Sequence, residues 1–322
     1  MQSFSYEKAQ SVEQATGTTG KFIAGGTTLV DLMKLGVETP TQLVDVTALP
    51  LAQVETLPNG GLRIGAMVRN SDLAHHPAVG KDYAVLSEAL LSGASPQLRN
   101  MATTGGNLLQ RTRCPYFRDP SYSNCNKRNP GSGCAAIGGH NRMMAILGTS
   151  DACIATHPSD MCVALTALEA TIQVEGPKGK RSIAIADFYK LPGTTPNVEN
   201  ALEPGELITY VDLPAPRKAS KQVYLKLRDR ASYEFALASA AVVAEVSGGH
   251  VRAVQIALGG VGTRPWRAHE AEAALTGKPA TAAYFRAAAE DALKGAKPSS
   301  ENGFKVELAK RCIVRAMTMA SA

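Results

Sequence analysis

Four cysteines lie close together in one stretch of the chain, between Arg111 and Asp160. They are Cys114, Cys125, Cys134 and Cys153, and 10, 8 and 18 residues separate them. Four thiolates can hold a [4Fe–4S] cluster, which tolerates irregular spacing. A structural zinc site usually contains two cysteines two to four residues apart, and disulfides need an oxidising compartment. The residues alone favour a cluster and leave zinc and disulfides open.

The stretch around these cysteines is also basic and irregular. It is rich in Gly, Pro, Asn and Ser, and a long loop without secondary structure is uncommon unless a function orders it. Residues 111–142 carry six basic side chains against Asp119 alone, so they supply +5 of the net charge of +6. This positive loop would offset the negative charge of a four-thiolate cluster. No helix-turn-helix, zinc-finger or aromatic stacking motif accompanies it, which argues against a nucleic-acid partner.

Two glycine turns could bind a phosphate. The stretch KFIAGGTTLVDLMKLG reads as a strand from Lys21 to Ala24, a turn, and a helix from about Leu29 to Leu35. Turn amides and a helix N-terminus together favour an anion. The pattern is neither GxGxxG nor a P-loop, so a plain strand–turn–helix connection is the alternative. A second turn, MATTGGNLLQ, raises the odds of one shared phosphate-bearing ligand.

The elements that must position these residues follow from hydrophobic patterning. We expect a strand at 4–6, a helix capped by Ser11, short strands in 43–69 and helices in 71–101. A helix at 160–169 and strands at 170–175, 181–186 and 204–214 follow. After a Pro/Lys-rich boundary, an α+β region ends in helices at about 268–276, 281–294 and 301–319. The segment from Gln222 starts as a strand, the stretch after it is ambiguous between helix and strand, and a Gly248-Gly249 turn and a further strand follow.

Bulk composition is that of an ordinary globular protein, with 322 residues, 44 % hydrophobic and 19 % charged. No run approaches the roughly 18 apolar residues that span a bilayer, so we expect no membrane span. The N-terminus lacks the basic and apolar regions of an export signal. The sequence therefore predicts a protein that stays in the cytoplasm or leaves it attached to something else.

Several motifs in order resemble a known family. They are KFIAGGTTLVDLMK, QLRNMATTGGNLLQ, PSDMCVALTALEA, PGELI and YLKLRDRASYEFALASAA. Along nearly its whole length the chain resembles the FAD-binding (medium) subunit of molybdenum hydroxylases of the xanthine dehydrogenase family. The cysteine spacing is most similar to that of the flavoprotein subunit of periplasmic aldehyde oxidoreductases. The hydroxybenzoyl-CoA reductase flavoprotein is the second resemblance. It ranks lower because its cysteine spacing differs from the spacing in this chain.

The resemblance implies an α+β fold in two domains. Residues 1–216 would form a two-lobed FAD-binding domain of the vanillyl-alcohol oxidase type, with lobes at about 1–55 and 56–216 and a cysteine-bearing insertion at 111–155. Residues 217–322 would form a C-terminal domain of the CO dehydrogenase flavoprotein type.

The resemblance also implies a set of FAD-binding residues. The first turn would line the pyrophosphate, with the amides of Gly25, Gly26 and Thr27 as donors, and the second turn would hold the other side. Ser159 and Asp160 would lie near the adenosine ribose or the pyrophosphate, Ile208 would pack on the flavin, and Lys226 would reach the isoalloxazine edge. The two turns contribute Lys21, Phe22, Ile23, Ala24, Gly25, Gly26, Thr27, Thr28, Leu29, Ala102, Thr103, Gly105, Gly106, Asn107 and Leu109. No covalent flavin link and no catalytic side chain is expected, and the resemblance favours a [4Fe–4S] cluster on the four cysteines.

The function implied is electron transfer within a molybdenum-dependent aldehyde oxidoreductase. A large partner subunit would carry the molybdenum cofactor and a small one the [2Fe–2S] clusters, making a heterotrimer. FAD on this chain would pass electrons to an external acceptor. Export to the periplasm would depend on a signal carried by a partner, with the cytoplasm as the alternative. A second hypothesis is a non-catalytic, metal-stabilised module whose basic loop binds an anionic partner.

Overall fold

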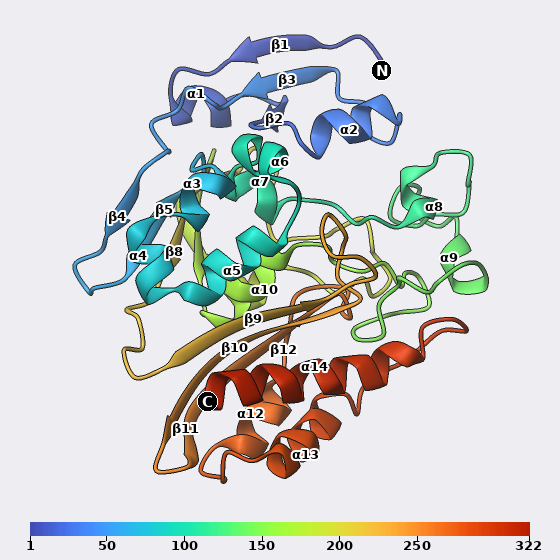
Figure 1. Cartoon of the computed structure of the whole chain (residues 1–322). Helices are drawn as coiled ribbons and strands as arrows, with labels where there is room; N and C mark the ends of the chain where they lie inside the picture. Colours follow the sequence, from blue (N-terminus) through green and yellow to red (C-terminus); the bar gives the residue numbers. More distant parts are fainter.

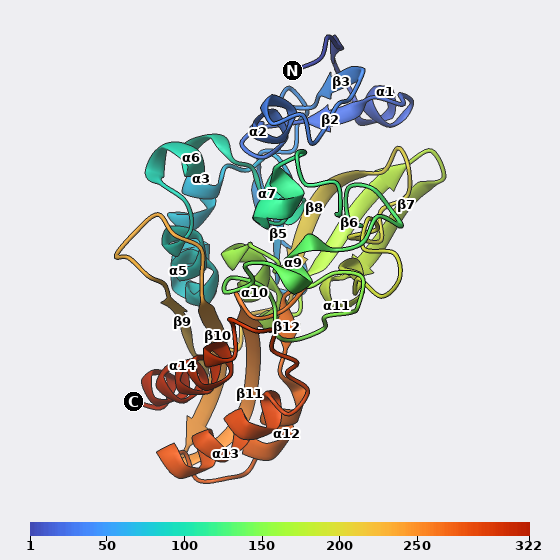
Figure 2. The same ribbon diagram turned by 90° about the vertical axis from the view of Figure 1, so that its right-hand side faces the viewer.

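Three β-sheets follow one another along the chain in the computed structural model, which describes residues 1–322 (Figure 1). The first sheet lies at the top of the view and the third at the bottom, and a quarter turn of the molecule keeps this order (Figure 2). The mixture of helices and sheets confirms the predicted α+β class. No helix of the chain combines the length and apolar composition needed to cross a membrane.

The first sheet is small and parallel. Its strands lie in the order β1 (Ser5–Lys8), β3 (Gln42–Asp45) and β2 (Lys21–Ile23). Parallel neighbours need crossover connections, and α1 (Val12–Thr16) and α2 (Leu29–Lys34) supply them. Ser11 caps α1 as predicted, because its hydroxyl accepts a hydrogen bond from the Gln14 amide at 3.1 Å. Residues 1–55 are called the N-terminal lobe below.

The second sheet is antiparallel and has five strands in the order β4-β5-β8-β6-β7. Helices from the region predicted as helical pack beside it, and α5 and α10 pack against each other. The strands are β4 (Val54–Thr56), β5 (Leu62–Gly65), β8 (Leu207–Leu213), β6 (Thr171–Gly176) and β7 (Gly179–Ala184). The helices are α3 (Asn70–Ala74), α4 (Pro77–Asp82), α5 (Ala84–Ser92), α6 (Pro96–Met101), α7 (Thr104–Leu108), α10 (Asp160–Ala167) and α11 (Ile185–Phe188).

The third sheet is antiparallel, in the order β12-β11-β10-β9, and resolves the ambiguous segment as strand. Alternate residues of β10 enter two different cores, with Ala241 and Val243 in one and Ala240 and Val242 in the other. Both faces are covered, by α14 and by α5 with α10 (Figure 1), so the strand reads as a continuous apolar run. The elements are β9 (Lys221–Leu227), β10 (Ala238–Ser247), β11 (His250–Gly259), β12 (Trp266–Arg267), α12 (His269–Leu275), α13 (Ala282–Ala292) and α14 (Phe304–Ser321).

Residues 111–155, called the cysteine segment below, are mostly irregular, as expected. They contain only the one-turn helices α8 (Pro115–Arg118) and α9 (Ala135–Gly138). The segment has its own small apolar core, which includes Phe117, Met144 and Ile154. Leu32 of α2 belongs to the same core, so the cysteine segment packs directly on the N-terminal lobe.

A buried lysine joins the C-terminal helix to this segment. Lys305 of α14 is fully buried, and its ammonium donates to the carbonyls of Met143 and Met144 at 3.0 Å and of Gly260 at 2.7 Å. Burial and the nearby charge of Arg142 lower the pKa of Lys305 to about 7. The three carbonyls therefore share one ammonium donor, and Met143 and Met144 also accept from the side chains of Thr156 and Asn302.

Lys305→Met should destabilise the protein, because it removes that donor and leaves buried carbonyl oxygens less well satisfied. We expect the free energy of unfolding to fall by about 2–3 kcal/mol, as measured by urea denaturation. Lys294→Met is the matched control, since Lys294 is exposed and pairs only with Asp291 on its own helix end. Equal effects of the two substitutions would contradict this role.

Candidate functional site

A large cleft lies where the N-terminal lobe meets the second sheet. Its volume is about 580 Å³, and three stretches line it: Gly20–Leu29, Thr103–Leu109 in part, and Asn197–Ile208 in part. Fourteen of the nineteen residues expected to bind FAD line this cleft. They are Lys21, Phe22, Ile23, Ala24, Gly25, Gly26, Thr27, Thr28, Leu29, Thr103, Gly105, Gly106, Leu109 and Ile208.

The first glycine turn has the conformation that only glycine adopts easily. Gly26 has a φ of +70°, in the left-handed region. A Cβ on Gly25 would lie 1.9 Å from the carbonyl oxygen of Met101, so the turn touches the end of α6 through backbone alone. This contact brings the first glycine turn against the segment that leads into the second. The two turns predicted to share a ligand therefore lie beside each other and line the same cleft.

The second glycine turn forms the short helix α7. The Thr103 hydroxyl caps it by accepting from the Gly106 amide at 3.2 Å. Ala102 and Asn107 belong to this turn but do not line the large cleft. Instead the Asn107 side-chain oxygen accepts a hydrogen bond from the Ser159 hydroxyl at 2.7 Å. Asn107 thereby links the second turn to the start of α10.

Asp160 and Lys226 form a buried ion pair behind α7. Their closest N···O distance is 2.8 Å, and their side chains are only 9 % and 4 % exposed. The Tyr224 hydroxyl also donates to Asp160 at 2.6 Å, and Lys226 donates to the Ser92 carbonyl at 3.1 Å. Ser159 and Asp160 line a second cavity of about 390 Å³, and Lys226 lines neither. Because Lys226 lines neither cavity, its contact with the isoalloxazine edge stays a prediction.

A chain of charges on the cleft wall was missed from the sequence. Lys21 pairs with Glu38 at 2.6 Å, Arg111 pairs with both Glu38 and Glu199, and Lys127 pairs with Glu199 at 2.7 Å. Burial alone would raise the pKa of Glu38 and Glu199, but their basic partners outweigh it and lower both. Glu199 lies in an irregular loop without periodicity, so its sequence context gave no signal.

The four cysteines converge on one small closed pocket. Cys114, Cys125, Cys134 and Cys153 all line it, together with Lys127 and Phe117. All are free thiols, and the backbones of Cys125 and Cys134 pair in an isolated antiparallel bridge. The free volume between them is about 10 Å³, and no group of three or more His, Cys, Asp or Glu side chains is placed to hold one metal ion. The structure thus gathers the predicted residues without a preformed metal site.

Two of these thiols are already polarised. A hydrogen bond between the side chains of Cys134 and Cys153 lowers the pKa of Cys134 to about 6 and raises that of Cys153. Burial raises the pKa of Cys114 to about 11. The lowered pKa of Cys134 favours its thiolate, which is the form of cysteine that binds metals.

The basic residues of the cysteine segment do not form a free patch. Arg111 and Lys127 pair with carboxylates of the cleft wall, and Arg113 and Arg118 pair with Asp31 of α2. Arg128 instead donates to backbone carbonyls at 2.7 and 2.9 Å within the segment. The expectation that this charge mainly offsets a cluster is corrected, because most of it is neutralised by other elements.

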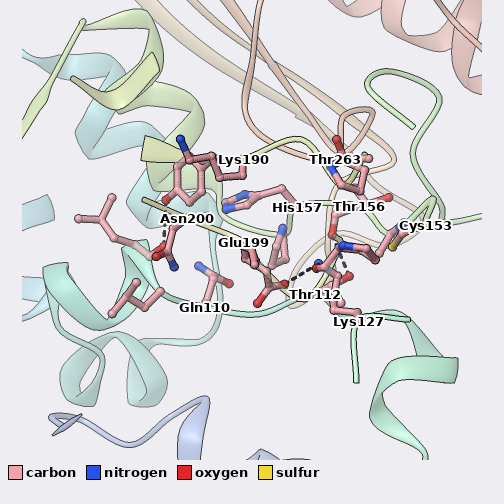
Figure 3. A pocket seen from close by; sticks show the side chains of 18 residues that line it. Gln110, Thr112, Lys127, Cys153, Thr156, His157, Lys190, Glu199, Asn200 and Thr263 are labelled. Atoms are coloured by element: carbon pink, nitrogen blue, oxygen red, sulfur yellow. Dashed lines mark hydrogen bonds and ion pairs between the residues drawn. The ribbon is translucent and has the colours of Figure 1, made fainter. Parts of the chain in front are cut away.

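His157 lies between the cleft and the cysteine pocket, on the wall of a polar chamber (Figure 3). Its Nδ1 accepts a hydrogen bond from the Ser159 amide at 3.3 Å, and its ring meets Tyr189 edge-on at 4.6 Å. Its Nε2 is enclosed and has no hydrogen-bond partner. Burial lowers the pKa of His157 to about 3, so the ring stays neutral.

This buried histidine should make the protein less stable in mild acid. Between pH 6.5 and 3 the unfolded chain binds a proton at His157 that the folded chain does not, so the free energy of unfolding falls as the pH falls. We expect His157→Gln to remove about 2 kcal/mol of the loss seen between pH 7 and 5, as measured by urea denaturation. His140→Gln is the control, because that ring is 93 % exposed. An unchanged pH dependence in His157→Gln would contradict the buried, neutral state.

Two family matches together span almost the whole chain. Residues 2–216 match the FAD binding domain in molybdopterin dehydrogenase, and residues 223–320 match the CO dehydrogenase flavoprotein C-terminal domain. The chain is 52 % identical to the aldehyde oxidoreductase FAD-binding subunit PaoB of Escherichia coli strain K12, over 100 % of this chain and 99 % of the relative. It is 27 % identical to the carbon monoxide dehydrogenase medium chain of Hydrogenophaga pseudoflava, over 98 % and 96 % of the two chains.

Solved structures share the fold over its full extent. Carbon monoxide dehydrogenase from Hydrogenophaga pseudoflava superposes with a TM-score of 0.77 at 28 % identity, covering 99 % of this chain and 97 % of that one. Quinoline 2-oxidoreductase from Pseudomonas putida 86 gives 0.76 at 25 % identity, with the same coverage. With the large cleft between two glycine turns, these likenesses identify the chain as a FAD-binding medium subunit of the molybdenum hydroxylase family.

Proposed function

We propose that this chain is the electron-transfer flavoprotein subunit of a molybdenum-dependent aldehyde oxidoreductase. The observation that carries the proposal is the 52 % identity, over the full length of both chains, to an aldehyde oxidoreductase FAD-binding subunit. The other relatives named act on different substrates and are half as similar. Electrons from partner [2Fe–2S] clusters would reach FAD in the large cleft and leave to an external acceptor.

The large cleft is the place proposed for FAD. The amides of Gly25, Gly26 and Thr27 line it beside the start of α2, where backbone N–H groups and the helix dipole favour a pyrophosphate. Each hydrogen bond to a charged group contributes roughly 1.5–3 kcal/mol, so a few amide donors hold the dinucleotide without a covalent link. Ala102, Asn107, Ser159, Asp160 and Lys226 are the remaining residues proposed to bind FAD, although they do not line the large cleft. Bound FAD supplies the redox chemistry, and the chain binds and orients it.

The domain division at 216/217 is part of the proposal. The last strand of the second sheet ends at Leu213, and the first strand of the third sheet begins at Lys221. The break between the two family matches, after residue 216 and before residue 223, supports the same boundary.

A [4Fe–4S] cluster on the four gathered cysteines is the finer part of the proposal. Four free thiols line one enclosed pocket, and Cys134 is already acidic. Their separation does not suit a single ion, whereas a cluster is a larger body held at its corners by four thiolates. The free volume between the thiols is small, so loading requires the side chains to turn outward.

The partners and the location follow from the family resemblance. A small [2Fe–2S] subunit and a large molybdenum-cofactor subunit would complete a heterotrimer. Export to the periplasm would occur on a partner that carries the signal. Copurification of three chains from a periplasmic fraction supports this part, and recovery of the chain alone from the cytoplasm contradicts it.

Gly26→Asp should expel the flavin. A side chain there has to adopt a φ of +70°, and a carboxylate in the amide nest repels the pyrophosphate. We expect the FAD-to-protein ratio, read from the absorption spectrum, to fall by at least tenfold. Gly80→Asp is the control, because Gly80 is exposed and a Cβ there meets nothing within 4 Å. Undiminished flavin in Gly26→Asp would refute the placement of FAD.

Cys125→Ser should abolish iron and sulfide binding. Cys125 is buried in the thiol pocket, whereas Cys312 is buried in the C-terminal core at 0 % exposure and serves as the control in Cys312→Ser. We expect close to four iron and four sulfide per wild-type chain and per Cys312→Ser chain. Zinc in place of iron in the wild type, or full iron retention in Cys125→Ser, would overturn the cluster.

A further inference from the structure

The cysteine segment fastens the end of the N-terminal lobe that carries the first glycine turn. The three strands of the lobe's sheet, β1, β2 and β3, pair only with one another. Leu32 of α2 packs in the core of the cysteine segment, and Asp31, its neighbour, pairs with Arg113 at 3.6 Å and with Arg118. The position of α2, and of the turn just before it, therefore depends on this segment.

A second connection runs through the cleft wall itself. Lys21, Glu38, Arg111, Glu199 and Lys127 alternate in sign, and each contacts the next through an ion pair. These five residues are called the charge ladder below. They come from three separate parts of the chain: the lobe, the cysteine segment, and the loop that precedes β8. Only the ladder joins all three.

The two ends of the ladder face different sites. Lys21, Glu38, Arg111 and Glu199 line the large cleft, whereas Lys127 lines the thiol pocket. Figure 3 shows Glu199, Lys127 and Cys153 together on the wall of the chamber between the two. Lys127 is only 11 % exposed, and it donates to Glu199 and to the Pro196 carbonyl at 2.9 Å. Lys127 and Cys153 line both this chamber and the thiol pocket.

Charge at the thiols must therefore affect the ladder. With the thiol pocket empty, Glu199 is the carboxylate that pairs with Lys127, whereas a cluster held by four thiolates adds negative charge on the pocket side of Lys127. Lys127 is then held from both sides, which fixes Glu199 and, through it, Arg111 and Glu38. Buried ion pairs respond strongly to such changes, because solvent does not screen them.

We infer that Arg111 and Glu199 are positioning residues of the flavin cleft, and that they couple occupation of the thiol pocket to FAD affinity. This inference rests on the proposed FAD and cluster sites. Loading of the four thiols tightens FAD binding, and bound FAD protects the loaded thiol pocket by the same factor, because coupling between two sites is reciprocal. Neither residue needs to touch the reacting atoms.

The test is a double-mutant cycle on the full chain, read as the FAD dissociation constant by fluorescence titration of flavin-free protein. The variants are Cys125→Ser, Glu199→Gln and the double substitution. Each single change should raise the constant about tenfold, and the double change should raise it by little more than either alone. Glu175→Gln is the control, because Glu175 pairs only with exposed Lys180 and lies outside the ladder and the cleft.

A second readout separates coupling from simple loss of fold. FAD should slow the removal of iron by a chelator in the wild type and should not do so in Glu199→Gln. The Cys125→Ser variant could lose its iron while its FAD dissociation constant stays within twofold of the wild-type value. That result would overturn the coupling and leave the proposed function intact. If the wild-type protein contains FAD but no iron, there is no cluster, and the proposed coupling between the cluster and FAD is overturned. An unchanged constant in Glu199→Gln would then also overturn the positioning role.

Discussion

The guanidinium of Arg111 between Glu38 and Glu199 is the interaction on which the site depends most. It joins the N-terminal lobe, the cysteine segment and the loop before β8 at the wall of the large cleft. The lobe and the cysteine segment also share an apolar core through Leu32, and Arg111 adds the charged link from both of them to the loop before β8. The side chains of Glu38, Arg111 and Glu199 are 13, 21 and 25 % exposed, so removing one charge leaves partly buried partners uncompensated, at a cost below the roughly 3–5 kcal/mol of a fully buried pair.

Much of the fold could be predicted from local patterns. The Ser11 cap, the strand–turn–helix around Gly26 and the amphipathic C-terminal helices each follow from short-range rules. β10 could not be assigned, because a strand covered on both faces has no alternation to distinguish it from a buried helix. The packing that holds β10 as a strand involves α5, α10 and α14, which lie far from it in the sequence.

The candidate site was predictable in its glycine turns and less so in its charges. The glycine turns are recognisable from their residue pattern, and the cysteines are recognisable from their residue type. Both could therefore be predicted without knowing which residues lie next to them in the fold. The pairing of Asp160 with Lys226, and of Arg111 with Glu199, joins residues 66 and 88 positions apart. Spacing does not encode such partners, and the basic segment therefore resembled a free patch before its carboxylates were placed.

We propose that this chain carries electrons out of an aldehyde-oxidising complex through FAD. Anaerobic addition of an aldehyde to the assembled complex, followed by stopped-flow absorbance in the flavin bands, tests it most directly. We expect the flavin absorbance to bleach in the complex. The flavin should stay oxidised when the isolated flavoprotein is mixed with the same aldehyde. Flavin that remains oxidised in a complex that is turning over aldehyde, or that bleaches equally in the isolated chain, would contradict it.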